Sequence, residues 1–352
     1  MEQCVVHRDI KVEQRDAGLK LQCYNLAALW IYWSSIFILP AKTMKEIESL
    51  LSSFLWKGLE LKSSGAKVAW AAVCVPKKEG GLGFKRLIEW NKASILRHLW
   101  AIYKKEDIPW LDNWHSLGPL YLKFVSLNVK VSSIAHNGRW RWPSSRNVVV
   151  KEIMENIAPD LVPHEDIVDL VIWTLSTART YSNKSAWEAL RSKAPDVGWW
   201  PMVWYKKHVP RWSFILWLAI LGRLSTKDRL HNWGIINDSY CVLCRSGVES
   251  HSHLFSIALS ISSSVWLRVR TCCGLPAHAW DLNSEAQWGS LYGKGGSMRV
   301  TLFKPCLAAS VYYLWKEWNG RICLQVGHKS IGVEKLILDE VKSCASSWKH
   351  EL

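Results

Sequence analysis

The first element that the hydrophobic pattern predicts is a helix between Pro40 and Gly58. Apolar residues recur there at the spacing of one helical face: Ile47, Leu50, Leu51, Phe54 and Leu55. Thr43 and Glu46 have the spacing of a capping box, so Thr43 is the expected N-cap. Gly58 can supply the left-handed stop.

Three further patterns complete the N-terminal third. The run 26–39 is the most apolar, but it is shorter than the roughly 20 residues of a membrane span and precedes Pro40, so a buried helix is expected. The basic, glycine-rich stretch 77–83 lacks the Lys-Ser/Thr ending and spacing of a phosphate-binding loop, which favours a plain turn. A second helix is predicted over 89–105. Its expected core stripe is Leu96, Leu99, Trp100 and Tyr103.

The middle of the chain predicts a linker and then a small hairpin-plus-helix unit. Residues from about 104 to 138 have no sustained period and contain Pro109, Gly118 and Pro119. The segments GRWRWP and DLVIWTLSTARTY then alternate in the manner of strands, and a helix is expected to start near Ser185.

The C-terminal half predicts four helices and makes the fold class mainly α. The first has Phe214, Trp217, Leu218 and Leu221 on one face and stops at Gly222. Ser225 and Asp228 mark the start of the second, which carries Leu230 and Trp233. A flexible connection, GSLYGKGGSMR, precedes the last two. Their apolar positions are Leu307, Val311, Leu314, Trp315, Trp318 and Ile322, and then Val333, Leu336, Ile337, Val341 and Cys344.

Composition indicates the charge of the expected partner and the cellular compartment. The 352 residues carry a formal charge of +15, which favours a polyanion such as nucleic acid, or secondarily an anionic membrane surface. A charge spread thinly over the surface is the alternative. Ten cysteines without an apolar leader indicate a reduced, intracellular setting, nuclear or cytoplasmic rather than secreted.

The stretch CVLCRSGVESHSHLF has the spacing of a zinc site. Cys241 and Cys244 can turn two thiolates toward one ion, and His251 and His253 follow within a dozen residues. Two alternatives stay open: reduced, partly buried cysteines beside surface histidines, and a redox pair. The redox pair would be expected at a helix start near a βαβ pattern, which is not evident.

Basic residues cluster just before this stretch and are candidates for phosphate contact. They are Lys206, Lys207, His208, Arg211, Arg223, Lys227 and Arg229. Trp204, Tyr205 and Trp212 lie among them, a mixture suited to phosphate pairing with base stacking. The alternative is that the tryptophans are core residues and the lysines are merely solvated.

A long ordered stretch carries a family resemblance. VPRWSFILWLAILGRLSTKDRLHNWGIINDSYCVLCRSGVESHSHLF resembles the zinc-binding domain near the C-terminus of plant LINE-type (non-LTR) retrotransposon reverse transcriptases. Residues 32–58 and 66–100 are similar to the segment after the polymerase palm in these elements, in the position of a thumb. The resemblance implies a thumb-like helical region at 20–105, a linker at 106–140, a zinc-binding domain at 141–270, and C-terminal linker and helices at 271–352.

Two departures limit what the resemblance implies. No Asp-Asp pair occurs in the chain, so it lacks the carboxylates that hold two catalytic metal ions, and we expect no enzyme. The family ligands carry over to Cys241, Cys244 and His253, but Ala258 stands where the fourth ligand, a cysteine, is expected. His251 or water can then fill the position, at reduced affinity.

The leading hypothesis is a truncated reverse transcriptase-like protein that binds RNA or DNA and holds a weakened structural zinc. It predicts no membrane and no small-molecule substrate, and it leaves the oligomeric state open. One alternative is a non-catalytic interaction or structural protein whose tryptophan-rich helices bind a protein partner. Another is a zinc hydrolase with an open fourth position, for which Glu249 is the candidate base.

Overall fold

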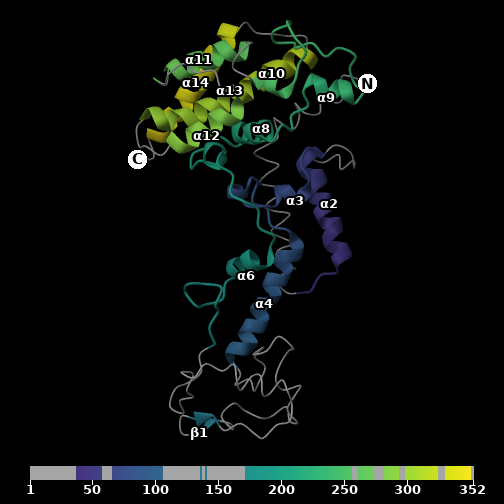
Figure 1. The fold of residues 1–352 in the computed structure, drawn as a ribbon, viewed down its shortest axis with the longest axis vertical. Helices are drawn as coiled ribbons and strands as arrows, with labels where there is room; N and C mark the ends of the chain where they lie inside the picture. The colour runs from purple at the N-terminus through teal and green to yellow at the C-terminus, as the bar shows by residue number, and fades with distance from the viewer. Residues whose placement is uncertain are drawn as a thin grey trace. The chain divides into compact units, whose positions relative to one another are not determined.

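The protein is mainly helical in a computed structural model, as the hydrophobic pattern predicts (Figure 1). The structure describes residues 37–57, 66–105, 135–136, 139–140, 171–255, 261–272, 274, 281–292, 298–323 and 330–349. Within them, no helix combines the length and the apolar character needed to cross a bilayer. The described residues fall into two compact units, one formed by 39–88 with 192–352 and the other by 37–38 with 89–191.

The larger unit is built around four helices that pack on one another, α8, α11, α13 and α14. Helix α13 packs against both α8 and α14, and α11 contacts α13 and α14 (Figure 1). The bounds of these four helices are α8 Pro210–Ile220, α11 Ile261–Cys272, α13 Met298–Cys323 and α14 Ser330–Lys349. The other helices of this unit are α2 Ala41–Lys57, α3 Trp70–Val73, α7 Trp200–Val203, α9 Lys227–Asn232, α10 His251–Phe255 and α12 Leu282–Tyr292, with a 3₁₀ turn η2 at Lys77–Glu79.

Helix α8 is the centre of the core. Residues 212–220 are all buried, so the helix is enclosed on every side rather than on the single predicted face. Trp217 stacks on Trp56 at 6.5 Å, and its indole N–H donates to the carbonyl of Gly80 over 2.8 Å. The predicted stop is confirmed: Gly222 has φ 62°, a conformation that glycine adopts without steric cost.

The N-terminal helix differs from its prediction at the start. Helix α2 begins at Ala41, and the Met44 N–H donates to the Pro40 carbonyl over 3.1 Å. Thr43 therefore lies inside the helix, and its prediction as N-cap is wrong because Pro40 already closes the first turn. Four of the five predicted apolar positions are buried, whereas Leu50 is 54% exposed.

The basic stretch after α3 forms the plain turn that the sequence favours. Gly80 has φ 92° and ends η2. A side chain at Gly81 would place its Cβ 2.1 Å from the Val75 carbonyl oxygen, so only glycine fits there. The turn brings Leu82 back toward α3, where its N–H donates to Val73 over 2.9 Å.

The smaller unit contains most of α4, Leu87–Lys105, and α6, Asn183–Leu190. The predicted helix at Ser185 is confirmed, with Ser182 as N-cap accepting from the Ser185 N–H. Trp100 contacts Trp173 and Tyr181, as expected of a core aromatic. Leu99 is instead 46% exposed.

Of the two predicted strand segments, GRWRWP is confirmed where the structure describes it, at Arg139–Trp140, whereas DLVIWTLSTARTY is wrong over its described residues. Residues 171–182 form turns, whose backbone bonds include Arg179 N–H to the Ser176 carbonyl. The strands of this region are two residues each, β1 Ala135–His136 and β2 Arg139–Trp140, paired antiparallel. The rest of 106–170, like most of the apolar run 26–39, lies outside the described residues.

Helices α13 and α14 confirm most of their predicted apolar positions, but Leu336 on α14 is 43% exposed. Helix α12 occupies 289–292, which were predicted as part of a flexible connection, and α11 was not predicted. These two helices share a buried ion pair in which Arg270 Nη1 lies 2.6 Å from Glu285 Oε1, with both side chains fully buried. The indole N–H of Trp266 donates to the same carboxylate over 3.1 Å. Such a pairing depends on tertiary contact, which the local hydrophobic pattern does not report.

Candidate metal centre

A short turn between α9 and α10 positions the two cysteines. Tyr240 and Val248 form an antiparallel bridge, and inside it the Cys241 N–H donates to the Gly247 carbonyl over 2.8 Å. Arg245 closes the turn on the Cys241 carbonyl with φ 57°, a left-handed conformation that costs a non-glycine residue about 1 kcal/mol. We call residues 239–253 the metal knuckle.

The knuckle brings together Cys241, Cys244 and His253. One donor atom from each lies within 4.8 Å of the others, and Cys244 Sγ is 3.1 Å from His253 Nε2. In a tetrahedral zinc site the sulfur and nitrogen ligands are about 3.6 Å apart, so small side-chain shifts would accommodate the ion. Two thiols and an imidazole are donors that zinc prefers, and this group can hold a metal ion, as the sequence predicts.

The two thiols have opposite electrostatic environments. Burial raises the pKa of Cys241 to about 12, and the nearby carboxylate of Glu249 acts in the same direction. Burial also raises the pKa of Cys244, but hydrogen bonds from Ser246 and contacts with His253 and Cys241 outweigh it and lower the pKa to about 6. Cys244 is therefore the thiol more readily available as a thiolate in the protein without metal.

The two histidines face different surroundings. The Ser250 hydroxyl accepts the His253 N–H over 3.0 Å, which sets the start of α10 and leaves the His253 ring beside Cys244. His251 is not part of the metal-binding group; its ring packs on Phe255 at 5.1 Å. This placement disfavours His251 as the fourth ligand, and Ala258 lies outside the described residues.

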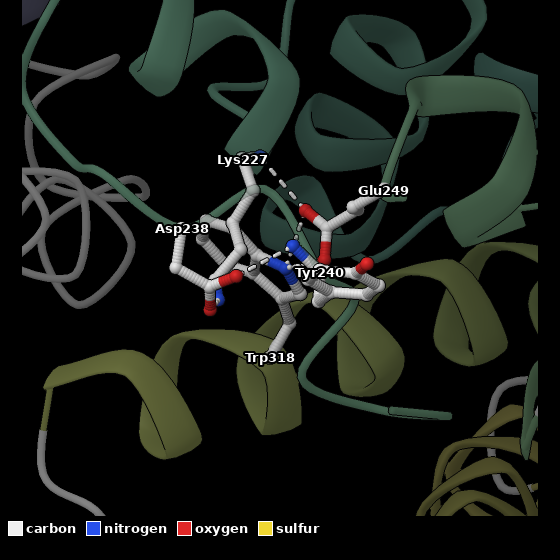
Figure 2. A network of polar contacts seen from close by, with 5 residues as sticks. All are labelled: Lys227, Asp238, Tyr240, Glu249 and Trp318. Atoms are coloured by element: carbon white, nitrogen blue, oxygen red, sulfur yellow. Dashed lines mark hydrogen bonds and ion pairs between the residues drawn. The ribbon is translucent and has the colours of Figure 1, made fainter. Parts of the chain in front are cut away.

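Glu249 is fully buried, and its carboxylate accepts hydrogen bonds from two other parts of the chain (Figure 2). Its carboxylate accepts the backbone N–H of Lys227 over 2.8 Å, and the Trp318 indole N–H is 2.8 Å from both of its oxygens. Burial raises the pKa of Glu249, and these hydrogen bonds oppose the rise. The side chain thus joins the start of α9 to α13, and both of its oxygens are already engaged.

The predicted basic residues divide into exposed and internally bonded groups. Lys206 and Arg223 are exposed, while Arg211 is exposed and forms an ion pair with Glu340 at 3.5 Å. Lys207 and His208 are half-buried.

Two other predicted cations serve the fold. The Lys227 ammonium is 2.7 Å from Asp238, an interaction visible in Figure 2. The Arg229 guanidinium donates to the Gly222 carbonyl over 2.7 Å. These bonds make Lys227 and Arg229 less available to a phosphate than the exposed residues.

Of the two alternatives for the tryptophans of this region, base stacking or a place in the core, the core is confirmed for two of them. Trp212 is fully buried and Trp204 is 8% exposed, because both belong to the core around α8. The ammonium of Lys77 lies 4.9 Å above the Trp204 ring, and that of Lys78 lies 6.0 Å above Trp200. Sequence reasoning missed this pair of lysines, because only the tertiary fold brings their turn to the 200–204 segment.

The comparisons with known proteins bear on the metal-binding segment first. Residues 181–266 match the family described as zinc-binding in reverse transcriptase, a range that contains Cys241, Cys244 and His253. The geometry and the match thus agree on the class of site.

A longer match extends this relationship. The chain is 24% identical to an Arabidopsis thaliana protein named "Putative ribonuclease H protein At1g65750", over 69% of the chain and 50% of the relative. The chain therefore spans about half the length of that curated relative. No solved structure matches the chain. The two sequence matches support a retrotransposon-related protein of reverse transcriptase type.

Proposed function

We propose that this chain is the thumb-like and zinc-binding part of a plant LINE-type (non-LTR) reverse transcriptase, and that it binds single-stranded RNA or DNA. The observation that carries the proposal is the Cys241, Cys244 and His253 group inside the segment that matches the zinc-binding family. The formal charge of +15 supports a polyanionic partner.

The metal in this proposal is structural. Zinc would cross-link the Cys241–Cys244 turn to α10 and so fix the knuckle. Glu249 is the candidate base of a zinc hydrolase, but its carboxylate accepts from Lys227 and Trp318 and is fully buried. A general base must reach the proton that it removes, and a buried, engaged carboxylate is badly placed to do so. The missing Asp-Asp pair supports the same conclusion for polymerisation.

Exposed cations give the proposed nucleic-acid surface. Lys206 and Arg223 are exposed, and Lys78 is exposed on the turn whose lysines lie above Trp200 and Trp204. Arg211 has an acidic neighbour in Glu340 and is a weaker candidate. We assign phosphate contact to Lys206, Arg223 and Lys78.

Burial weakens the alternative of a tryptophan-mediated protein interface. The tryptophans of the two central helices, Trp212, Trp217, Trp315 and Trp318, are each at most 1% exposed. Their faces are covered by other parts of this chain, so they offer no ready surface to a partner.

Salt-dependent binding tests the nucleic-acid proposal. Removal of one cation that pairs with a phosphate should decrease the slope of log affinity against log salt by about 0.7 on a single strand. Lys206→Gln and Arg223→Gln should therefore each reduce the slope for a fluorescent single-stranded RNA by about 0.7, whereas Lys342→Gln on α14, which removes the same single charge, should leave the slope unchanged. Salt-independent binding by the wild type, or none to RNA or DNA, would overturn the proposal.

Metal content tests the zinc proposal separately. The family pattern predicts that Ala258→Cys binds zinc more tightly than the wild type, and that Cys244→Ser loses binding. His251→Ala should match the wild type, because its ring lies apart from the donor group. A chromophoric chelator in competition measures all four affinities. Equal affinity of the Ala258→Cys variant and the wild type would remove position 258 from the site.

A further inference from the structure

Helix α13 contacts the metal knuckle at the residues between the two cysteine ligands. Nη1 of Arg321 donates to the carbonyl of Val242 over 3.1 Å and to that of Leu243 over 3.3 Å. These are the two residues that separate Cys241 from Cys244, so their peptide planes determine how the two thiols are aimed.

The Arg321 guanidinium is itself held in place. Its Nε lies 2.8 Å from a carboxylate oxygen of Glu317 one turn earlier on α13, and the Glu317 side chain is 5% exposed. A planar guanidinium fixed on one edge by a carboxylate presents its remaining N–H groups in a fixed direction. Arg321 is therefore a rigid support for the turn.

A second contact joins the same helix to the other end of the knuckle. Trp318 donates its indole N–H to Glu249, whose own N–H donates to the Ser239 carbonyl over 2.8 Å. Trp318 in turn stacks on Trp315 at 4.5 Å. One face of α13 thus holds both the cysteine turn and the bridge that closes it.

We infer that α13 is part of the metal-binding domain and that Arg321 is a positioning residue for zinc, although α13 lies outside the matched range 181–266. The inference rests on the proposed structural zinc. Ligand geometry is set by the groups that hydrogen-bond the ligand-bearing backbone, and loss of such a supporting contact typically weakens a metal site about 10–100-fold.

The test is the metal affinity of Arg321→Ala. Zinc affinity, measured by chelator competition, should fall about 10-fold or more. The Co²⁺ absorption spectrum should show altered coordination. The control is Lys316→Ala on the same helix, whose ammonium lies 5.8 Å above Tyr313 rather than on the knuckle, and which should bind zinc like the wild type. Unchanged affinity in Arg321→Ala would overturn the inference.

Folding and metal effects can be separated. Urea unfolding in excess chelator measures the free energy of unfolding of the metal-free protein. If Arg321 positions the ligands, Arg321→Ala should lose more free energy of zinc binding than free energy of unfolding. If Arg321→Ala does not fold, Arg321→Lys becomes the test variant, because lysine keeps the positive charge but lacks the planar guanidinium that bonds Glu317 and the knuckle at once. Wild-type affinity in Arg321→Lys would then refute the positioning role. A wild type that binds neither Zn²⁺ nor Co²⁺ would instead refute the proposed function.

Coupling between the sites must also run from metal to helix. If α13 favours the metal-ready knuckle, then zinc must stabilise the contacts of α13 by the same free energy. Hydrogen exchange of the amides of residues 317–323 should therefore slow when zinc is added to the wild type. The same addition should slow exchange less in Arg321→Ala. Equal protection with and without bound zinc would contradict the coupling.

Discussion

The metal knuckle and the core around α8 are held together by different forces. The core buries large apolar side chains such as Trp217 and Leu216, each fully covered. The knuckle buries few apolar residues and depends on backbone bonds, such as Cys241 to Gly247, and on contacts from α13. Apolar burial stabilises a region without help from outside it, whereas a short hydrogen-bonded turn gains little net free energy alone.

The difference teaches which part of the molecule should respond to metal. Backbone bonds that water can replace contribute only about 1 kcal/mol each, so a metal cross-link can dominate the stability of the knuckle. We expect a smaller dependence on metal in the core, because apolar burial stabilises it, although Cys241 and Leu243 of the knuckle pack into the same cluster. Substitutions in the two regions should therefore differ in how much they lower the free energy of unfolding and in how many residues they affect.

The largest expected effect comes from the core. Trp217→Ala should lower the free energy of unfolding by about 3–5 kcal/mol, because it leaves a cavity next to Trp56 and leaves the Gly80 carbonyl unpaired. Urea unfolding followed by circular dichroism measures the change. Trp233→Ala is the control, because Trp233 is 55% exposed and its loss should cost about 0.5 kcal/mol. Similar losses in the two variants would show that burial does not determine the stability of the core.

An intermediate effect is expected at Glu249, which joins the two regions. Glu249→Ala leaves the buried N–H groups of Lys227 and Trp318 without an acceptor, and should cost about 3 kcal/mol. Glu249→Gln keeps an acceptor oxygen and removes a buried charge, so its loss should be clearly smaller in the same urea titration. Equal losses would mean that the charge, rather than the hydrogen bonds, matters. If Glu249→Gln abolished a hydrolytic activity while leaving the fold intact, the hydrolase alternative would return.

Local features of this fold were predictable from the sequence. The helices around Trp217, Leu314 and Ile337 follow from apolar spacing, and the stop at Gly222 from the need for positive φ. The grouping of Cys241, Cys244 and His253 also follows from short separations along the chain. All of these depend on residues within a few turns of one another.

Features that depend on distant residues were not predictable. From the sequence, Lys227 is expected to be a surface cation. In the fold, however, Asp238 pairs with its ammonium and Glu249 accepts its backbone N–H. The sequence allows Trp212 to be either a base-stacking aromatic or a core residue. Only the packing of α8 against α13 shows that Trp212 is a core residue. The strand prediction for 171–181 failed because the β-branched and aromatic residues there lie in turns, in which the ring of Trp173 packs against that of Tyr181.

The smallest effect on global stability, and the most local one, is expected from Cys244→Ser. The serine hydroxyl is a poor zinc ligand, so the variant should behave like the wild type in excess chelator. Hydrogen exchange of the Cys241, Arg245 and Glu249 amides should accelerate, because the bonds of the knuckle open when the cross-link is removed.

Amides of α8 should keep their protection in this variant, because the free energy of global unfolding of the core changes by less than about 1 kcal/mol. The control is Cys272→Ser, which removes an exposed thiol at the end of α11 and should leave both regions unchanged. If the α8 amides lost protection together with the knuckle, the two regions would unfold as one cooperative unit, and zinc would stabilise the whole domain rather than a turn on its surface.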